Sequence, residues 1–226
     1  MGRTGIYTVA LFCTCLPHAL ASEISGRITI EKGGNTKLVA PAVYDLRGVA
    51  LSSNAPVGKT SSGYERVGIW LESNAPEPAP AVKAEMRQRN QHLDPDLLVV
   101  PVGSTVDFPN LDPIFHNIFS LSRTQSFDLG YYAEGRSRSI SFPHAGIVQV
   151  YCHVHPNMHA VIIIAASRWF GKPASDGAFS WSNVPAGNYR MCVWQKSAGV
   201  VRRKIVVPTT GSLRVDMSIP NEDPEN

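Results

Sequence analysis

The feature that most constrains this chain is a run of metal-binding side chains, CHVHPNM, at 152–158. It overlaps the end of GIVQVYC at 146–152, a stretch in which the side chains alternate in character. Successive residues of a strand point to opposite faces, so Val148, Val150 and Cys152 are expected on one face. The run is followed by another apolar stretch. We therefore expect a metal-binding loop that joins two neighbouring strands.

The side chains of this loop match the ligands of a copper site. Cys152 offers a thiolate, His155 an imidazole and Met158 a thioether, with C-x2-H-x2-M spacing. His116 lies well upstream and would add a second imidazole from a separate segment. Blue-copper sites use these four groups, because sulfur suits Cu(I) and imidazole suits both oxidation states. The four residues predict one copper ion in a site suited to single-electron transfer.

Other interpretations of the same residues remain open. Cys152 and His155 could bind zinc, although a thioether such as that of Met158 is not among the usual zinc ligands. Met158 could also fill the core, since methionine fits irregular gaps. As a nucleophile, Cys152 has no recognisable acid or oxyanion partner, so we do not expect an enzyme.

Simpler roles are expected for the remaining histidines and for Cys192, the second cysteine that remains after removal of the signal. Cys192 lies within a strand-like stretch and is expected to be a small buried hydrophobe, with a Cys152–Cys192 disulfide as the alternative. A second metal site built from His153 and His159 is a further alternative. The four histidines expected at the surface or in hydrogen bonds, and not as ligands, are His92, His144, His153 and His159.

Residues 1–21 are typical of a secretory signal peptide. Arg3 supplies the positive charge, residues 6–16 form a short apolar stretch, and Ala-Leu-Ala at 19–21 is a cleavage motif. Cleavage there would make Ser22 the mature N-terminus and leave a periplasmic or secreted protein. The apolar stretch is short for a bilayer span, and no other segment approaches that length, so no membrane span is expected after removal of the signal.

The charge balance excludes some classes of partner. The formal net charge is +3, and it falls to +2 without Arg3. There is no basic stripe and no acidic tail. Nucleic acid is therefore not an expected partner.

Short alternating or β-branched runs, separated by Gly, Pro, Asn and Ser, predict an all-β sandwich with no helix of ordinary length. A Pro/Ala-rich linker is expected at 74–81. The expected strands are 25–30, 68–72, 83–89, 97–102, 105–109, 137–142, 146–152, 160–165, 200–207 and 213–219.

Residues 84–166 resemble a cupredoxin of the plastocyanin and amicyanin kind. The stretches that carry the resemblance are VVPVGSTVDFPN (99–110), FHNIFS (115–120), FDLG (127–130) and VQVYCHVHPNM (148–158). The loop after the cysteine is short, as in amicyanin. A Greek-key β-sandwich is the fold that this resemblance implies.

The resemblance also implies roles for individual residues. His116, Cys152 and His155 would be the equatorial ligands of one type 1 copper ion, with Met158 axial. Asn117 would pin the cysteine-bearing loop to the histidine-bearing loop. His155 would be the electron exit, and the implied partner is a redox protein such as a c-type cytochrome or a copper oxidoreductase.

The flanking segments are similar to a second small sandwich. DGAFSWSNVPAGNYRMCVWQ (176–195) resembles the latter half of carboxypeptidase-regulatory-like, transthyretin-type sandwiches, and ISGRITI (24–30) and VGIWLES (67–73) resemble the first half. The simplest arrangement inserts the cupredoxin between the strands of one such sandwich. Unrelated terminal extensions are the alternative. The expected divisions are a signal (1–21), the first part of the sandwich with the linker (22–80), the cupredoxin (81–167), the second part (168–220) and a frayed tail (221–226).

Three functions follow from these features. The first is a periplasmic blue-copper protein that carries single electrons between redox partners. The second is a copper-binding or copper-delivery module with no electron-transfer role. The third is an interaction protein whose copper site is vestigial, which the complete ligand set argues against.

Overall fold

The computed structural model describes residues 21–31 and 63–220, and within them the regular structure is almost all β-strand. A single 3-10 turn, η1 (Tyr64–Arg66), is the one helical element of these residues. The strands are β1 (Ala21–Glu31), β2 (Gly68–Glu72), β3 (Lys83–Glu85), β4 (Arg87–Arg89), β5 (His92–Asp94), β6 (Leu97–Pro101), β7 (Thr105–Pro109), β8 (His116–Leu121), β9 (Ser126–Tyr132), β10 (Ser137–Ser141), β11 (Gly146–Tyr151), β12 (His159–Ala165), β13 (Phe170–Gly171), β14 (Ala178–Pro185), β15 (Gly187–Gln195), β16 (Gly199–Val207), β17 (Ser212–Arg214) and β18 (Met217–Pro220). The predicted all-β class is confirmed.

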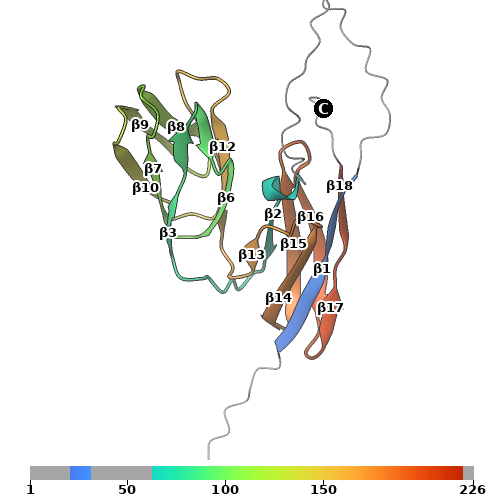
Figure 1. Ribbon diagram of the computed structural model, residues 1–226. Coiled ribbons are helices and arrows are strands. Elements are labelled where there is room, and N and C mark those ends of the chain that lie inside the picture. Colours follow the sequence, from blue (N-terminus) through green and yellow to red (C-terminus); the bar gives the residue numbers. More distant parts are fainter. Residues whose placement is uncertain (1–20, 32–62, 221–226) are drawn as a thin grey trace, which may run out of the picture.

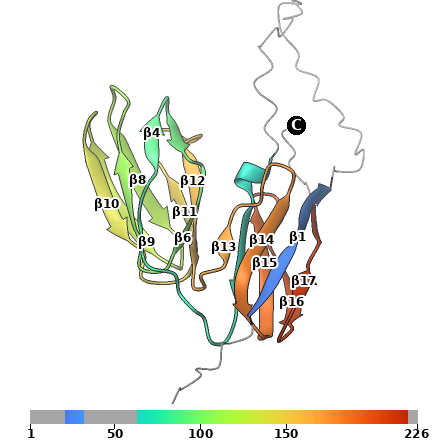
Figure 2. The same cartoon turned by 60° about the horizontal axis from the view of Figure 1, so that its bottom comes forward.

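The strands form two sandwiches that stand side by side (Figures 1 and 2). The flanking sandwich consists of β1, β2 and β13 to β18, which come from both ends of the described chain. One of its sheets joins β14, β1, β17 and β18, and the other has the order β13-β2-β15-β16. The central sandwich consists of β3 to β12, with sheets of order β6-β12-β11-β8-β9 and β10-β7-β3 and a small β4-β5 hairpin.

Distant segments share the core of the flanking sandwich. Ile28 of β1 and Ile69 of β2 are buried in one cluster with Met191 and Val193 of β15, and Tyr189 packs against it. The pairing of β1 with β14 and of β2 with β15 is antiparallel. Burial of this apolar surface is the main favourable term that holds the ends of the chain together.

A third, smaller apolar cluster lies where the two sandwiches meet. It combines Trp70 and Cys192 of the flanking sandwich with Leu97, Ile163 and other residues of the central one. Gly68 permits the close approach of β2, since a Cβ there would lie 2.3 Å from Cδ1 of Ile163. The two sandwiches are therefore packed together through side chains as well as joined by the chain.

The register of the central sandwich places the ends of two strands together. Strand β11 pairs antiparallel with β12 along its length and with β8 through Tyr151 and Phe119. Val148 and Val150 are fully buried, as the alternation predicted. Because β8 runs antiparallel to β11, the start of β8 lies beside the end of β11. His116 and Cys152 thus reach the same end of the sheet.

Some strands differ from the predicted ones for local reasons. The expected strand at 83–89 is divided into β3 and β4 by the fully buried Met86, after which β4 pairs with β5. The expected strand at 213–219 is interrupted at Asp216, whose Oδ1 accepts the Arg27 N–H at 2.8 Å in place of a backbone acceptor. Strands β5, β8 and β9 were not predicted, because polar residues mask their alternation.

Several predictions lie outside the described residues. The signal peptide, apart from Ala21, and the tail at 221–226 belong to this group. No helix of the described part is long and apolar enough to cross a membrane. Residues 73–82, which include the expected linker, connect β2 to β3 without regular structure.

Candidate metal centre

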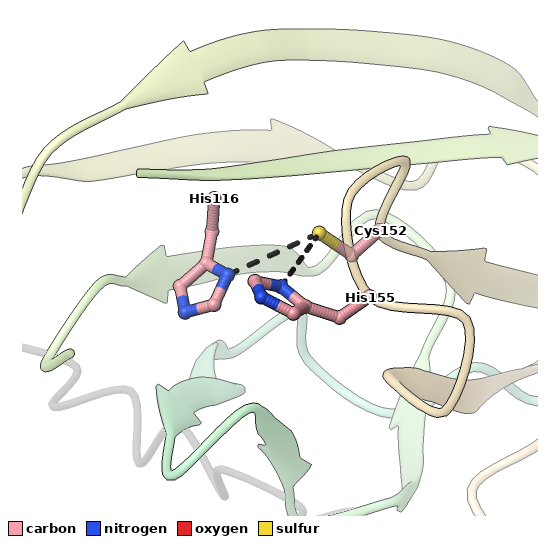
Figure 3. Close-up of side chains that lie close together, drawn as sticks. All are labelled: His116, Cys152 and His155. Carbon is pink, nitrogen blue, oxygen red and sulfur yellow. Dashed lines mark hydrogen bonds between the residues drawn. The ribbon is translucent and has the colours of Figure 1, made fainter. Parts of the chain in front are cut away.

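Three predicted ligands meet at one end of the central sandwich (Figure 3). The Sγ atom of Cys152 lies 3.9 Å from Nδ1 of His116 and 3.9 Å from Nδ1 of His155. Both rings turn this nitrogen toward the sulfur. The ligand atoms of the three side chains all lie within 4.8 Å of one another. The structure therefore assembles one thiol and two imidazoles from two separate segments.

His116 is held by a carboxylate that the sequence analysis did not single out. It is fully buried, and its Nε2 lies 2.8 Å from Oδ2 of Asp112. An ionised carboxylate only accepts hydrogen bonds, so Nε2–H is the donor, and in the neutral imidazole this leaves the Nδ1 lone pair directed toward Cys152. Metal-binding histidines commonly have such a partner on the second nitrogen. The spacing of four residues in DPIFH was the available sequence signal.

Asp112 is ionised in its buried position. Burial raises the pKa of its carboxyl, whereas hydrogen bonds from the Gln91 N–H, the His116 ring and the Asn90 N–H lower it by more. The net pKa lies below the ordinary value for aspartate. A fixed negative charge therefore lies directly behind the His116 ring.

The loop that carries the other ligands is closed by its own backbone. The Cys152 N–H donates to the Met158 carbonyl at 3.2 Å, and the Met158 N–H donates to the His155 carbonyl at 3.0 Å. Met158 is fully buried in the same apolar cluster as Cys152. These bonds hold the loop in shape before any ion is present. The axial role of Met158 stays a prediction.

Asn117 connects the two ligand segments differently from the way the resemblance implied. Its Nδ2 donates to Oδ1 of Asp128 at 2.6 Å, while its own Oδ1 is buried without a partner in the described structure. Oδ2 of Asp128 lies 3.7 Å from Nε2 of His153, on the cysteine loop. The connection therefore runs through Asp128, whose pKa is lowered mainly by the Gly130 N–H and then by Asn117.

The other histidines do not join the ligand group. His153 stacks on Phe119, with ring centroids 3.8 Å apart and planes 4° apart. His92 contacts the carbonyl of Asn90 through Nδ1 at 2.7 Å. His144 and His159 are exposed. Within the described ranges, no second set of three His, Cys, Asp or Glu side chains comes together in this way.

Cys192 is a free, fully buried thiol in the cluster between the sandwiches. Burial, with a smaller contribution from Glu72, raises its pKa to about 12. Cys152 is also free, so the alternative Cys152–Cys192 disulfide is not formed. The expectation that Cys192 acts as a small buried hydrophobe is confirmed.

Both sulfur–nitrogen distances suit one small cation between the atoms. Metal bonds to thiolate and imidazole measure about 2.3 and 2.0 to 2.1 Å. Cys152 and one nitrogen of each of His116 and His155 would therefore be the residues that hold the ion. A donor set of one cysteine and two histidines is typical of blue copper.

Comparisons with solved structures match two cupredoxins to part of this chain. No family model matches the chain, and no curated protein matches it. A purple cupredoxin from Nitrosopumilus maritimus is 26% identical over 36% of this chain and 98% of its own, with a TM-score of 0.34. A reduced amicyanin variant is 19% identical over 42% of this chain and 97% of its own, with a TM-score of 0.34.

A further match is the copper-containing nitrite reductase from Thermus scotoductus, which is 24% identical over 41% of this chain. The match covers only 24% of that enzyme, and its TM-score is also 0.34. TM-scores this low do not establish a shared function. The functional argument therefore rests on the residues and geometry of the site itself.

Proposed function

We propose that this protein is a type 1 copper protein that carries single electrons between redox partners. The observation that supports the proposal is the Cys152 thiol, which lies 3.9 Å from one Nδ1 atom of each of two histidines. A bound copper ion would supply one-electron Cu(II)/Cu(I) chemistry at this position.

The chain's own residues keep the donor atoms in place. His116 is fully buried and is oriented by Asp112, and Cys152 is only 6% exposed. Backbone hydrogen bonds between Cys152, His155 and Met158 stabilise the second segment. Donor atoms that are held in fixed positions favour one ligand geometry for both oxidation states of copper. Such rigidity suits electron transfer better than hydrolysis.

His155 is the proposed point of electron exit. Its side chain is partly exposed, whereas that of His116 is fully buried. Phe115 and Val154, beside the two ligand histidines in the chain, are 62% and 50% exposed. Pro156 is exposed as well. We propose that a redox protein, such as a c-type cytochrome or a copper oxidoreductase, docks on this apolar rim.

The proposed location is the periplasm or the cell exterior, after cleavage near Ala21. The support is the signal-like composition of residues 1–21. Mass spectrometry of the mature N-terminus in an exported preparation tests it. A mature protein that begins at Ser22 is expected, and retention of Arg3 in the exported protein would contradict it.

The decisive experiment for the function is a visible and EPR spectrum after addition of one equivalent of Cu(II), with Cys152→Ser in parallel. An intense thiolate-to-copper band with narrow copper hyperfine splitting is expected in the parent protein. The variant should lose both features. A pale, ordinary Cu(II) spectrum that the substitution leaves unchanged would overturn the proposal.

A second measurement separates electron transfer from copper delivery. Rapid electron self-exchange with slow metal exchange supports an electron carrier. Slow self-exchange with rapid loss of copper to a competing chelator would favour the delivery module.

A further inference from the structure

The buried carboxylate of Asp112, behind His116, is hydrogen-bonded to a hairpin that contains no proposed ligand. Asp112 is 5% exposed and accepts three hydrogen bonds. One is from Nε2 of His116, and the others are from the backbone N–H groups of Asn90 at 2.6 Å and Gln91 at 2.8 Å. A buried charge is costly unless it is fully paired. Here each pairing group also restrains the position of the carboxylate.

The two backbone donors belong to the turn of the β4-β5 hairpin. Arg89 pairs with His92, so the loop contains only Asn90 and Gln91. Both have positive φ, 54° and 58°, as a type I′ turn requires. Non-glycine residues adopt this conformation at some cost. The turn directs both N–H groups to one carboxylate, which offsets part of that cost.

The hairpin is itself fixed to the loop that precedes His116. The Leu111 N–H donates to the Gln88 carbonyl at 2.9 Å, and the Gln88 amide donates to Tyr132 Oη at 2.6 Å. The Asn110 amide donates to the carbonyl of Ile114 at 2.8 Å. This set of bonds leaves Asp112 little freedom to move. The ring of His116 is consequently held in one orientation.

We propose that Asp112, held by the Asn90–Gln91 turn, is the positioning residue that sets the tautomer of His116 and lowers the reduction potential of the metal centre. The inference deepens the proposed function and rests on it for the reduction potential, although not for the tautomer. A negative charge behind the imidazole strengthens its donation and favours the more highly charged oxidation state. Asp112 touches the ligand and not the metal, so it acts through His116.

The first test needs no metal and no variant. Nitrogen-15 shifts of the imidazole rings in the metal-free protein should show His116 with its proton on Nε2 and none on Nδ1. A ring protonated on Nδ1, or a mixture of the two tautomers, would overturn the inference whether or not copper binds.

The second test compares Asp112→Asn with a charge-matched control. Asp107→Asn removes the same charge from β7, where Asp107 pairs with Lys83 at 2.9 Å and with Ser139. Asp112→Asn should weaken Cu(II) binding about tenfold more than Cu(I) binding, which raises the potential by about 60 mV. Asp107→Asn should shift the potential far less. Asp112→Glu retains the charge and should recover part of the change.

The outcomes separate the two proposals. If the parent protein forms no blue centre, the proposed function fails while the tautomer measurement still tests Asp112. If a blue centre forms and Asp112→Asn has the parent potential, or Asp107→Asn shifts it equally, the inference is overturned.

Discussion

The central and flanking sandwiches each bury one free cysteine, but the surroundings of the two thiols differ. One lies among possible metal ligands and the other among apolar side chains. Cys152 is 6% exposed and faces two imidazole nitrogens. Cys192 is fully buried beside Trp70 and Ile163 and contacts the Arg190 carbonyl at 3.7 Å. Burial by itself favours the neutral thiol. The two thiols are buried to a similar degree, so burial does not distinguish them, and Cys152 differs in having two imidazole nitrogens beside it that could share a metal ion.

The largest expected effect separates the two cysteines directly. Cys152→Ser should abolish the intense visible band, because the hydroxyl does not replace the thiolate as a copper ligand. Cys192→Ser should leave the band unchanged and lower the free energy of unfolding by about 1 to 3 kcal/mol, since it buries a hydroxyl among apolar groups. Visible titration with Cu(II) and urea unfolding of both variants measure the contrast. Equal loss of the band in both would remove the distinction.

The next effect tests the axial position within the central sandwich. Met158→Leu conserves volume and should cost less than about 1.5 kcal/mol of stability. If Met158 is the axial ligand, the blue centre should persist with a higher potential, since loss of its sulfur would change the relative binding of Cu(II) and Cu(I), at about 60 mV for each tenfold change. Spectroelectrochemistry checks the shift. An unchanged potential would leave Met158 as core packing alone.

Part of the loss of stability at alkaline pH should come from the flanking thiol. The folded-state pKa of Cys192 is raised to about 12, above its ordinary value of 9.0. Its stabilising contribution is therefore complete below pH 9 and is lost as the pH rises toward 12, at up to about 1.4 kcal/mol per pH unit. Urea unfolding at pH 8 and pH 10 should show a smaller loss in Cys192→Ala. A loss of the same size in the variant would assign the effect to other groups.

The smallest effect concerns the contact between the sandwiches. Gly68→Ala places a Cβ 2.3 Å from Cδ1 of Ile163, the end of a buried side chain. We expect a loss of about 1 kcal/mol in the free energy of unfolding with no change in the copper spectrum. Ile163→Val removes the opposing methyl, so the double variant should lose less than the sum of the single ones. Strict additivity would show that the contact is not strained.

Much of the β architecture was predictable because its signals are local. The alternation at 146–152 predicted β11 to within one residue, and β2 and β7 have the predicted bounds. Strands β8 and β9 were not predicted, because their polar residues interrupt the apolar–polar alternation of a half-buried strand. Whether these polar side chains are exposed depends on the neighbouring strands. The β4-β5 hairpin was missed as well, because its turn uses Asn90 and Gln91 in place of glycine.

In the candidate site, too, local features were predictable and contacts between distant segments were not. The spacing from Cys152 to Met158 names three donors on one short loop, and such a loop determines its own geometry through nearby hydrogen bonds. The hydrogen-bond partners of His116 and Asn117 could not be predicted in the same way. Asp112 is close to His116 in sequence, but the residues that hold it, 90–91, lie about twenty residues away. They bind through backbone N–H groups, which every residue except proline has, so their side chains give no signal. Asp128 likewise reaches Asn117 only because β8 and β9 pair.

The sequence alone determined the class of structure, the donor chemistry and the faces of the clearest strands, because residue type and a two-residue period depend only on neighbours along the chain. Tertiary structure decided which donors meet. Pairing of β11 with β8 brings His116 to Cys152, and pairing of β1 with β14 joins segments about 150 residues apart. Such contacts depend on burial and register in three dimensions, where many alternative pairings have similar local preferences.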